Sequence, residues 1–470
     1  MPDRPNILVI MSDEHAPQYS GLHGHPQVQS PNMERLADMS VTFDNAYCNS
    51  PICGPSRMSF MTGRYINRIG AYDNGFPLSS ATVTWAHSLR QAGYDVVLSG
   101  KQHFCGSDQL HGFRTQLARD LHAELWTRDG VPRGAPDWEA GIVDAKRPWG
   151  GLEEAGPGTT TSIEVDDQVE QAALAYLADP ARSARPWCLN VGFIAPHFPL
   201  VVPQRFWDLY PLDQIDMPDI PEGHLQSMHP VYQRMRRMFG LADFPEDLVR
   251  RGRAGYYGLI TYLDEKIGRL IDALESTGQL DNTIIVHTSD HGEMNGEHGM
   301  WRKSNMYEAS SRIPLQIAWP GHIPGGRRVS QNVSLVDLVA TLVEVSEATQ
   351  DVAPLDGDSL MPLLCDHTKA AESWKDEAFC EYLAHGVLRP VSMLKQGDYK
   401  LNISLGDAPE LFNTSADPGE FDDLAGSAEH QPLLEDMQQR LLEIWGDPEQ
   451  IEQQVLESQR RRRFIENAGD

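Results

Sequence analysis

The chain has 470 residues, 40% of them hydrophobic, which is enough for one large α/β domain with a sizeable core and a smaller C-terminal unit. Its formal net charge of −28 argues against nucleic-acid binding, which needs clustered lysine and arginine against the phosphates. An anionic substrate must therefore meet a local positive pocket set in an acidic background.

Cysteine usage and the apolar segments bear on the compartment. The six cysteines are widely scattered without a Cys-x-x-Cys pair, so they form no disulfide scaffold. Residues 1–5 lead straight into an apolar run, without the basic start and small-residue cleavage site of a signal peptide. No window has the apolar length of a membrane span. We therefore expect a reduced, cytoplasmic protein without a membrane partner.

The first predicted element is a buried parallel strand over the apolar, β-branched run 6–11. Asp13 and Glu14 follow it and should lie at its carboxyl end, where open α/β sheets bind ligands. From local sequence alone, a turn that merely uses Asp and Glu is an equally good interpretation. A helix is then predicted to begin near residues 30–37, and the run 41–47 leads into the next segment.

The segment 53–64 holds a side chain that can become a nucleophile, Cys53, with Arg57 four residues later. If a helix begins here, Arg57 lies on the same helix face as Cys53, which sits near the positive N-terminal end. A helix N-terminus with a guanidinium makes a site for a tetrahedral oxyanion. The alternative is a buried cysteine in a turn before a helix, because unpaired cysteine packs as a small hydrophobe.

Further strands are predicted at 94–98, 187–194, 283–288 and 313–319. Several polar residues follow the first three of these strands: Lys101, His103, His197, Asp290, His291 and Lys303. Such side chains meet around one site only if the sheet is parallel or mostly so. Taken singly, a lysine or histidine in a loop is more often simply solvated.

Two long segments lie between these strands. Residues 105–180 are rich in Gly, Pro, Trp and Asp and are expected to cross the mouth of the site, where specificity often resides. The tryptophans of this segment line a pocket or pack in the core: Trp126, Trp138 and Trp149. Residues 256–274 have helical spacing, and their apolar face belongs to the core.

The pattern changes after residue 365, which divides a catalytic domain, 1–365, from a C-terminal subdomain, 366–470. Short runs predict a small antiparallel sheet with strands at 377–382, 391–394, 399–403 and 410–414. An amphipathic helix follows at 432–445. The basic run 459–465 is either a frayed terminus or a contact segment.

The Cys-x-Pro-Ser-Arg and Thr-Gly-Arg pattern within 53–64 resembles the signature of type I sulfatases, formylglycine-dependent members of the alkaline-phosphatase-like superfamily. In that family a formylglycine-generating enzyme oxidises the cysteine to Cα-formylglycine, which is the nucleophile. The resemblance covers nearly the whole chain and is closest to the choline-sulfatase and phosphonate-monoester-hydrolase branch. It implies a mostly parallel central sheet flanked by helices, with a smaller C-terminal antiparallel sheet.

The resemblance also implies a metal site, with its ligands at Asp13, Glu14, Cys53, Asp290 and His291. Glu14 departs from the Asp or Gln that the family usually has at its position. Two carboxylates alone would suit Ca²⁺, whereas a histidine ligand favours Mn²⁺. We therefore expect one divalent ion of either kind.

The catalytic roles follow from the same resemblance. Arg57, Lys101 and Lys303 are expected to hold the sulfate oxygens and offset their charge. His197 or Lys303 is expected to protonate the leaving oxygen. His103 is expected to act as the base that expels sulfate from the modified Cys53 and returns the aldehyde.

The expected activity is hydrolysis of small aryl or alkyl sulfate monoesters. A phosphonate mono- or phosphodiester hydrolase is the first alternative, because both substrates are tetrahedral oxyanions of similar size. A choline sulfatase is disfavoured by His385, which stands where those enzymes place an acid. A binding protein on a decayed scaffold remains a third interpretation. The tail 459–465 resembles the arginine-rich tail of choline sulfatases and suggests a homo-oligomer, a dimer or tetramer.

Overall fold

The computed structural model describes residues 4–121, 148–181, 185–241, 244–349, 353–365, 369 and 372–467. Its main sheet has the order β10-β2-β9-β8-β1-β6-β3-β4. The strands are β1 Asn6–Asp13, β2 Ser40–Tyr47, β3 Asp95–Gly100, β4 Thr115–Gln116, β6 Trp187–Pro196, β8 Thr283–Ser289, β9 Arg312–Ala318 and β10 Arg327–Ser334. Among these described strands β9 runs antiparallel to its neighbours, and the other pairs are parallel. The predicted mostly parallel sheet is confirmed.

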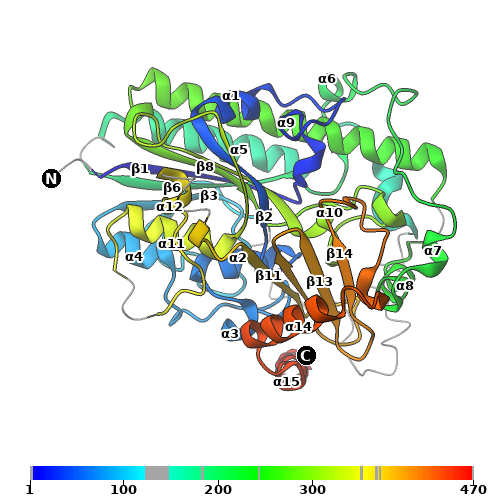
Figure 1. The fold of residues 1–470 in the computed structure, drawn as a ribbon. Coiled ribbons are helices and arrows are strands. Elements are labelled where there is room, and N and C mark those ends of the chain that lie inside the picture. The colour runs from blue at the N-terminus through cyan, green and yellow to red at the C-terminus, as the bar shows by residue number, and fades with distance from the viewer. Residues whose placement is uncertain are drawn as a thin grey trace.

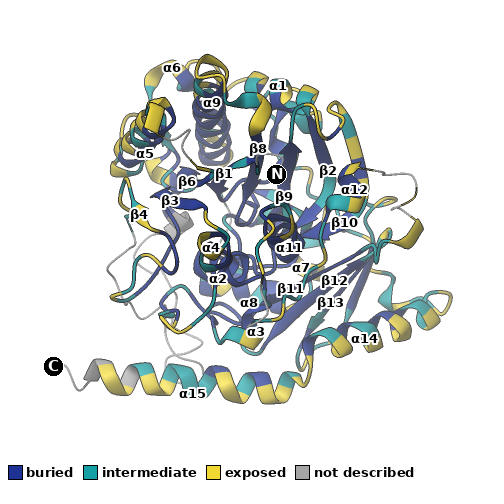
Figure 2. Ribbon diagram, turned by 90° about the vertical axis from the view of Figure 1, so that its left-hand side faces the viewer, coloured by how far each residue is buried: buried dark blue, intermediate teal, exposed yellow. Residues whose placement is uncertain are grey.

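Helices cover both faces of this sheet (Figure 1). One face carries α1 Pro31–Met39, α5 Thr161–Ala178 and α9 Glu246–Ser276, and the other carries α2 Cys53–Thr62, α4 Trp85–Gln91 and α11 Leu335–Val345. Because both faces are covered, the strands are buried along most of their length (Figure 2). The shorter described elements are α3 Ile66–Ile69, α6 Gln204–Trp207, α7 His224–Ser227, α8 Pro230–Met238, α10 Glu308–Ser311, α12 Met361–Cys365, β5 Gly156–Pro157 and β7 Val201–Val202.

The long helix α9 begins ten residues before the predicted 256–274 segment. Its first part contains Gly252 and Gly255, which weaken the apolar periodicity in the sequence. A Cβ at Gly255 would lie 2.4 Å from the backbone oxygen of Leu200, and one at Gly252 would lie 2.7 Å from the Trp301 ring. The glycines therefore let the helix approach its neighbours closely, at positions where a local pattern predicts weak helix.

The C-terminal residues form the predicted small antiparallel sheet, in the order β11-β12-β13-β14. Its strands are β11 Glu377–Tyr382, β12 Val391–Gln396, β13 Tyr399–Ser404 and β14 Glu410–Asn413. Two helices, α14 Gln431–Trp445 and α15 Pro448–Asn467, complete the chain. The basic run 459–465 lies in the last turns of α15, and its role as a contact segment stays a prediction. The division at residue 365 stays a prediction.

The sequence also predicts that the chain has no membrane span and no disulfide scaffold, and that three tryptophans of residues 105–180 line a pocket or pack in the core. No helix among the described residues is both long and apolar enough to cross a bilayer. None of the six cysteines, all of which the structure describes, forms a disulfide bond. Trp126, Trp138 and the side chain of Trp149 lie outside the described part of the chain, so their pocket role stays a prediction.

Candidate active site

The carboxyl ends of four parallel strands place the predicted site residues at one edge of the main sheet. Strands β1 and β8 stay in register up to Ser12 opposite Ser289, so Asp13 and Asp290 come next at the same edge. Strand β6 pairs with β1, and β3 pairs with β6, both in parallel. The residues that follow β3 and β6, Lys101 and His197, therefore reach this edge as well.

Cys53 is the first residue of α2, so the predicted helix start is confirmed. Its Sγ lies 3.2 Å from His291 Nε2 and 3.7 Å from Asp13 Oδ1. Pro55 is tolerated two residues later because the first-turn N–H groups of a helix have no partner within the helix. The N-terminal end of α2 thus points its dipole at the two strand ends.

Two groups of side chains, which share Asp13, could hold a metal ion, and within each group the ligand atoms lie within 4.8 Å of one another. The first group is Asp13, Cys53, Asp290 and His291, and the second is Asp13, Glu14 and His197. All of them except His197 are buried. Two carboxylates and a ring nitrogen at this spacing match the donors that divalent ions take in proteins. The structure therefore contains a possible metal site beside Cys53, where the five predicted ligands lie together with His197, which the sequence does not predict as a ligand.

The guanidinium of Arg57 hydrogen-bonds both acids of this site, Asp13 and Asp290. Its Nε donates to Asp290 Oδ2 at 2.7 Å, its Nη2 to Asp13 Oδ2 at 3.1 Å and its Nη1 to the Lys101 carbonyl at 2.8 Å. Burial raises the pKa of Asp290 to about 6, although the charge of Arg57 lowers it. The Arg57 side chain is fully buried and orients the two carboxylates, and the expectation that it also holds sulfate oxygens stays a prediction.

The site is electropositive around residue 53. Lys101 Nζ lies 2.6 Å from Asp13 Oδ2. Burial raises the pKa of the Cys53 thiol, but the charges of Lys101, Lys303 and His291 outweigh burial and hold the pKa well below its ordinary value. Burial disfavours the charged form of His291 too, yet the acids beside it raise its pKa to about 10. This is the local positive pocket that an acidic chain needs for an anionic substrate.

Lys303, His197 and Glu14 form a second cluster nearer to solvent. Lys303 Nζ lies 2.9 Å from His197 Nε2 and 3.0 Å from Glu14 Oε1, and His197 Nε2 lies 3.2 Å from Glu14 Oε2. The Nδ1 of His197 donates to the Phe198 carbonyl at 2.7 Å, so Nε2 is the ring nitrogen that faces Lys303 and Glu14. The side chains of Lys303 and His197 are 10% and 20% exposed, so both can meet a substrate.

Backbone strain marks the loops of the site. Glu14, His103 and Arg302 have φ values of 65°, 60° and 68°, a region that favours glycine. Such residues persist where surrounding contacts fix them, and they gather at functional sites. The N–H of His103 donates to Asp120 Oδ2 at 2.6 Å, and a hydrogen bond from the His103 ring helps to lower the pKa of Cys53.

Several supporting residues escape sequence reasoning. Asp120 also accepts the N–H of Gln102, so it holds the loop of His103, and no local pattern marks it. Asn74 Oδ1 accepts the N–H of Gly54 at 2.8 Å, and only its place before a glycine in a turn hints at a role. Glu293 lies in the loop that follows β8 and accepts the N–H of Arg302 at 2.7 Å, so it holds the backbone next to Lys303.

Comparison with known proteins places this site in a family. Residues 5–348 match the family described as Sulfatase, and residues 296–446 match the C-terminal family of N-sulphoglucosamine sulphohydrolase. The chain belongs to the sulfatase family. It is a sulfuric ester hydrolase, as the sequence predicts, and the mostly parallel sheet with a small antiparallel sheet is the sulfatase fold.

Relatives of this sulfatase match over most of their length. It is 36% identical to the choline-sulfatase of Rhizobium meliloti over 99% of this chain and 91% of the relative. It is 30% identical to Arylsulfatase K of Danio rerio over 90% of this chain and 80% of the relative. A solved structure in complex with its substrate D-glucosamine-2-N,6-O-disulfate is 25% identical, with a TM-score of 0.75 over 95% and 99% of the two chains. The phosphonate monoester hydrolase of Agrobacterium radiobacter shares the fold at 24% identity and a TM-score of 0.75 over 94% and 95%.

Proposed function

We propose that this sulfatase hydrolyses small aryl or alkyl sulfate monoesters with residue 53, converted to Cα-formylglycine, as its nucleophile. One observation carries the proposal: the Cys53 side chain lies within 4 Å of both His291 and Asp13, at the positive end of α2. Lys101 and Lys303 surround it with positive charge. A sulfate group placed against residue 53 would therefore meet donors and cations on several sides.

The chemistry of the donor set fits a divalent ion and a hydrated aldehyde. Asp13 directs Oδ1 toward Cys53 and gives Oδ2 to Lys101, so one oxygen of this acid faces the proposed ion. A bound Ca²⁺ or Mn²⁺ would lower the pKa of a hydroxyl beside it, and a hydrated formylglycine would offer two geminal hydroxyls. One would attack sulfur, and loss of the proton from the other would re-form the aldehyde as the C–O bond to the sulfate breaks. Asp290, His291 and Glu14 complete the proposed ligands, and Glu14 also belongs to the second cluster with Lys303 and His197.

The remaining roles follow from which groups can hold or move a proton. Lys303 and His197 lie together at the exposed side of the site, where the leaving oxygen departs, so either can donate to it. His103 hydrogen bonds to residue 53 and is placed to take a proton from it. Lys101 and Lys303 offset the charge of the sulfate. Arg57 acts as a positioning residue, because it holds the carboxylates of Asp13 and Asp290 in place.

Turnover of the Cys53→Ala variant tests the nucleophile. The variant should fold, because Cys53 and alanine are both small buried side chains, and should hydrolyse no 4-nitrophenyl sulfate. Mass spectrometry of the wild-type peptide that contains residue 53 should show the loss of mass from thiol to aldehyde. Wild-type rates in Cys53→Ala, or an active enzyme with an unmodified thiol, would refute the assignment.

Phosphonate hydrolysis is the second candidate, because the site offers no described group that distinguishes sulfur from phosphorus. The fold is shared with phosphonate monoester hydrolases, including one from Silicibacter pomeroyi at 25% identity and a TM-score of 0.74. Rates for an aryl sulfate and the matching aryl phosphonate at equal concentration separate the two. A higher kcat/KM for the phosphonate would replace the first candidate by the second.

Choline sulfate is the less favoured sulfate ester. Glu381 of β11 is fully buried and accepts the backbone N–H of Asn67 and the ring N–H of Trp445, so it does not face a substrate cation. His385, after that strand, packs its ring against Phe239. Neither residue supplies a carboxylate for a quaternary ammonium group, although the Rhizobium meliloti choline-sulfatase is a relative over nearly the whole chain.

Two partners belong to the same proposal. A formylglycine-generating enzyme would act on Cys53 before the chain folds around it, because the side chain is buried in the folded protein. A second copy of the chain would cover the end of α15, where Phe464 and Ile465 of the basic run are exposed. Light scattering should show a dimer or tetramer, and a monomer at micromolar concentration would contradict this part.

A further inference from the structure

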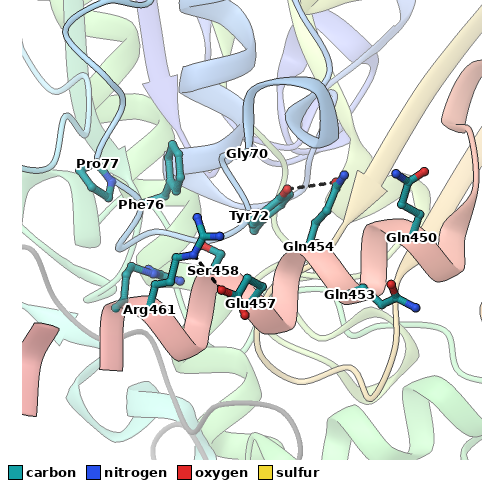
Figure 3. Close-up of a pocket in the computed structure, with 11 residues that line it drawn as sticks. Gly70, Tyr72, Phe76, Pro77, Gln450, Gln453, Gln454, Glu457, Ser458 and Arg461 are labelled. Atoms are coloured by element: carbon teal, nitrogen blue, oxygen red, sulfur yellow. Dashed lines mark hydrogen bonds and ion pairs between the residues drawn. The ribbon is translucent and has the colours of Figure 1, made fainter. Parts of the chain in front are cut away.

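The C-terminal helix α15 lies along the loop 70–77, and a groove of about 610 Å³ runs between them (Figure 3). Ile451 and Val455 of this helix are buried in the smaller core cluster together with Tyr72. The hydroxyl of Tyr72 also donates to Gln454 Oε1 at 3.4 Å. Arg462 stands eleven residues after Ile451, which is three helical turns, and so lies on the same face of α15.

Arg462 forms a forked ion pair with Asp73 of this loop. Its Nη1 donates to Oδ1 at 2.6 Å, and its Nη2 donates to Oδ2. The side chains are 16% and 4% exposed, unlike a surface pair. Asp73 Oδ1 accepts the N–H of Gly75 as well, at 3.0 Å, so the carboxylate fixes the turn that contains Asn74. A forked, largely buried pair holds its partners in one geometry.

Asn74 connects this turn to the nucleophile. Its Oδ1 accepts the N–H of Gly54, one of the first-turn donors of α2 that have no partner within the helix. Its carbonyl accepts the thiol of Cys105 at 3.1 Å, which ties the turn to the loop after His103. A Cβ at Gly54 would lie 3.1 Å from the Cα of Asn74, so the two segments are in close contact.

We propose that Arg462 is a positioning residue for sulfate ester hydrolysis, acting on residue 53 through Asp73 and Asn74. The inference rests on the proposed role of residue 53. The chain of contacts runs from α15 to the forked ion pair, from Asp73 to the turn, and from Asn74 to the N–H beside the nucleophile. Without the pair, the turn loses its fixed carboxylate and Asn74 no longer holds the first turn of α2 in place.

The structure supplies a matched control on the same helix. Arg460 pairs with Glu457 of α15 at 2.9 Å and is 77% exposed, so Arg460→Gln removes the same charge without touching the turn. In Arg462→Gln we expect kcat for 4-nitrophenyl sulfate, measured well below the thermal midpoint, to fall about tenfold with KM unchanged, because the perturbed group is the nucleophile. The thermal midpoint should fall as well, because Asp73 stays buried without its partner. In Arg460→Gln all three should stay at wild-type values. Rates are divided by the formylglycine content of each preparation.

A double-mutant cycle asks whether Arg462 acts through Asn74. If it does, Arg462→Gln should add little loss to a chain that already carries Asn74→Ala. Arg462→Lys, which keeps the charge but not the fork, should recover part of kcat. Equal kcat in Arg462→Gln and Arg460→Gln, or losses that multiply in the double variant, would overturn the inference. If the wild type hydrolyses no sulfate ester, the proposed function itself fails. That result is distinct from the two outcomes that would overturn the role of Arg462.

Discussion

The substitution Arg57→Met tests whether the metal site depends on its buried arginine. Arg57 is fully buried and joins Asp13 and Asp290 at 3.1 and 2.7 Å. Removing it leaves two buried carboxylates without their shared cation, which costs about 3–5 kcal/mol in the free energy of unfolding. Arg35 offers a control, because it joins Asp272 and Glu275 at 2.7 Å each on the surface, where loss of an ion pair costs about 0–1 kcal/mol.

The same substitution should weaken metal binding. Burial already raises the pKa of Asp290 to about 6, and Arg57 is the strongest of the groups that lower it. Without Arg57 the pKa of Asp290 rises further, so more of the acid is protonated near neutral pH and it becomes a poorer ligand. We expect the affinity for Mn²⁺ to fall about 10- to 100-fold, as it does when a group that orients a ligand is lost.

Two measurements decide the outcome. Urea unfolding with a chelator present gives the stability of Arg57→Met, Arg35→Met and wild type, and calorimetric titration with Mn²⁺ gives the affinity of each. The reasoning is refuted if Arg57→Met loses no more stability than Arg35→Met and binds Mn²⁺ as the wild type does. It is also refuted if only stability changes, because Arg57 would then hold the fold without orienting the ligands.

Three further outcomes are expected. Chelation should lower both activity and the thermal midpoint, because Asp13, Glu14 and Asp290 lose a neutralising ion. A thermal midpoint that changes neither on chelation nor on addition of Mn²⁺ or Ca²⁺ would contradict the metal site. In His197→Gln, kcat/KM should fall more for alkyl sulfates than for 4-nitrophenyl sulfate, whose leaving group needs no proton, and equal losses would remove His197 as the acid. Burial raises the pKa of Asp166 to about 7, above its unfolded value, so its contribution to stability falls as the pH rises from about 4 to about 7. The stability of Asp166→Asn relative to wild type should therefore increase over that range, measured by urea unfolding, and a constant difference would contradict the raised pKa.

Strands that end in charged residues account for most of what the sequence predicts. Asp13, Asp290 and Lys101 follow apolar runs long enough to be buried strands, and parallel pairing then brings them to one edge. The start of α2 at Cys53 is predictable for a similar reason, because the spacing of the segment fits one helix face. These features depend on local patterns and on one topological rule.

Other features depend on contacts between distant segments and leave little trace in the local sequence. The contacts of Arg57 with Asp13 and Asp290 could not be predicted, because the spacing from Cys53 does not say which side chains a guanidinium at that position meets. Asp120 and Asn74 act through backbone N–H groups of other loops, and many residue types precede such turns. The end of α15 is helical because Ile451 and Val455 anchor it in a core that tail composition does not reveal.

Covalent capture on residue 53 tests the central claim most directly. In Cys53→Ser a single hydroxyl can attack sulfur and release the phenol, but no geminal hydroxyl is present to expel the sulfate. Intact-protein mass spectrometry of this variant after mixing with 4-nitrophenyl sulfate should show one sulfate on residue 53 and one equivalent of 4-nitrophenol, after which turnover stops. Steady turnover at the wild-type rate, or release of 4-nitrophenol without a sulfated residue 53, would contradict the account.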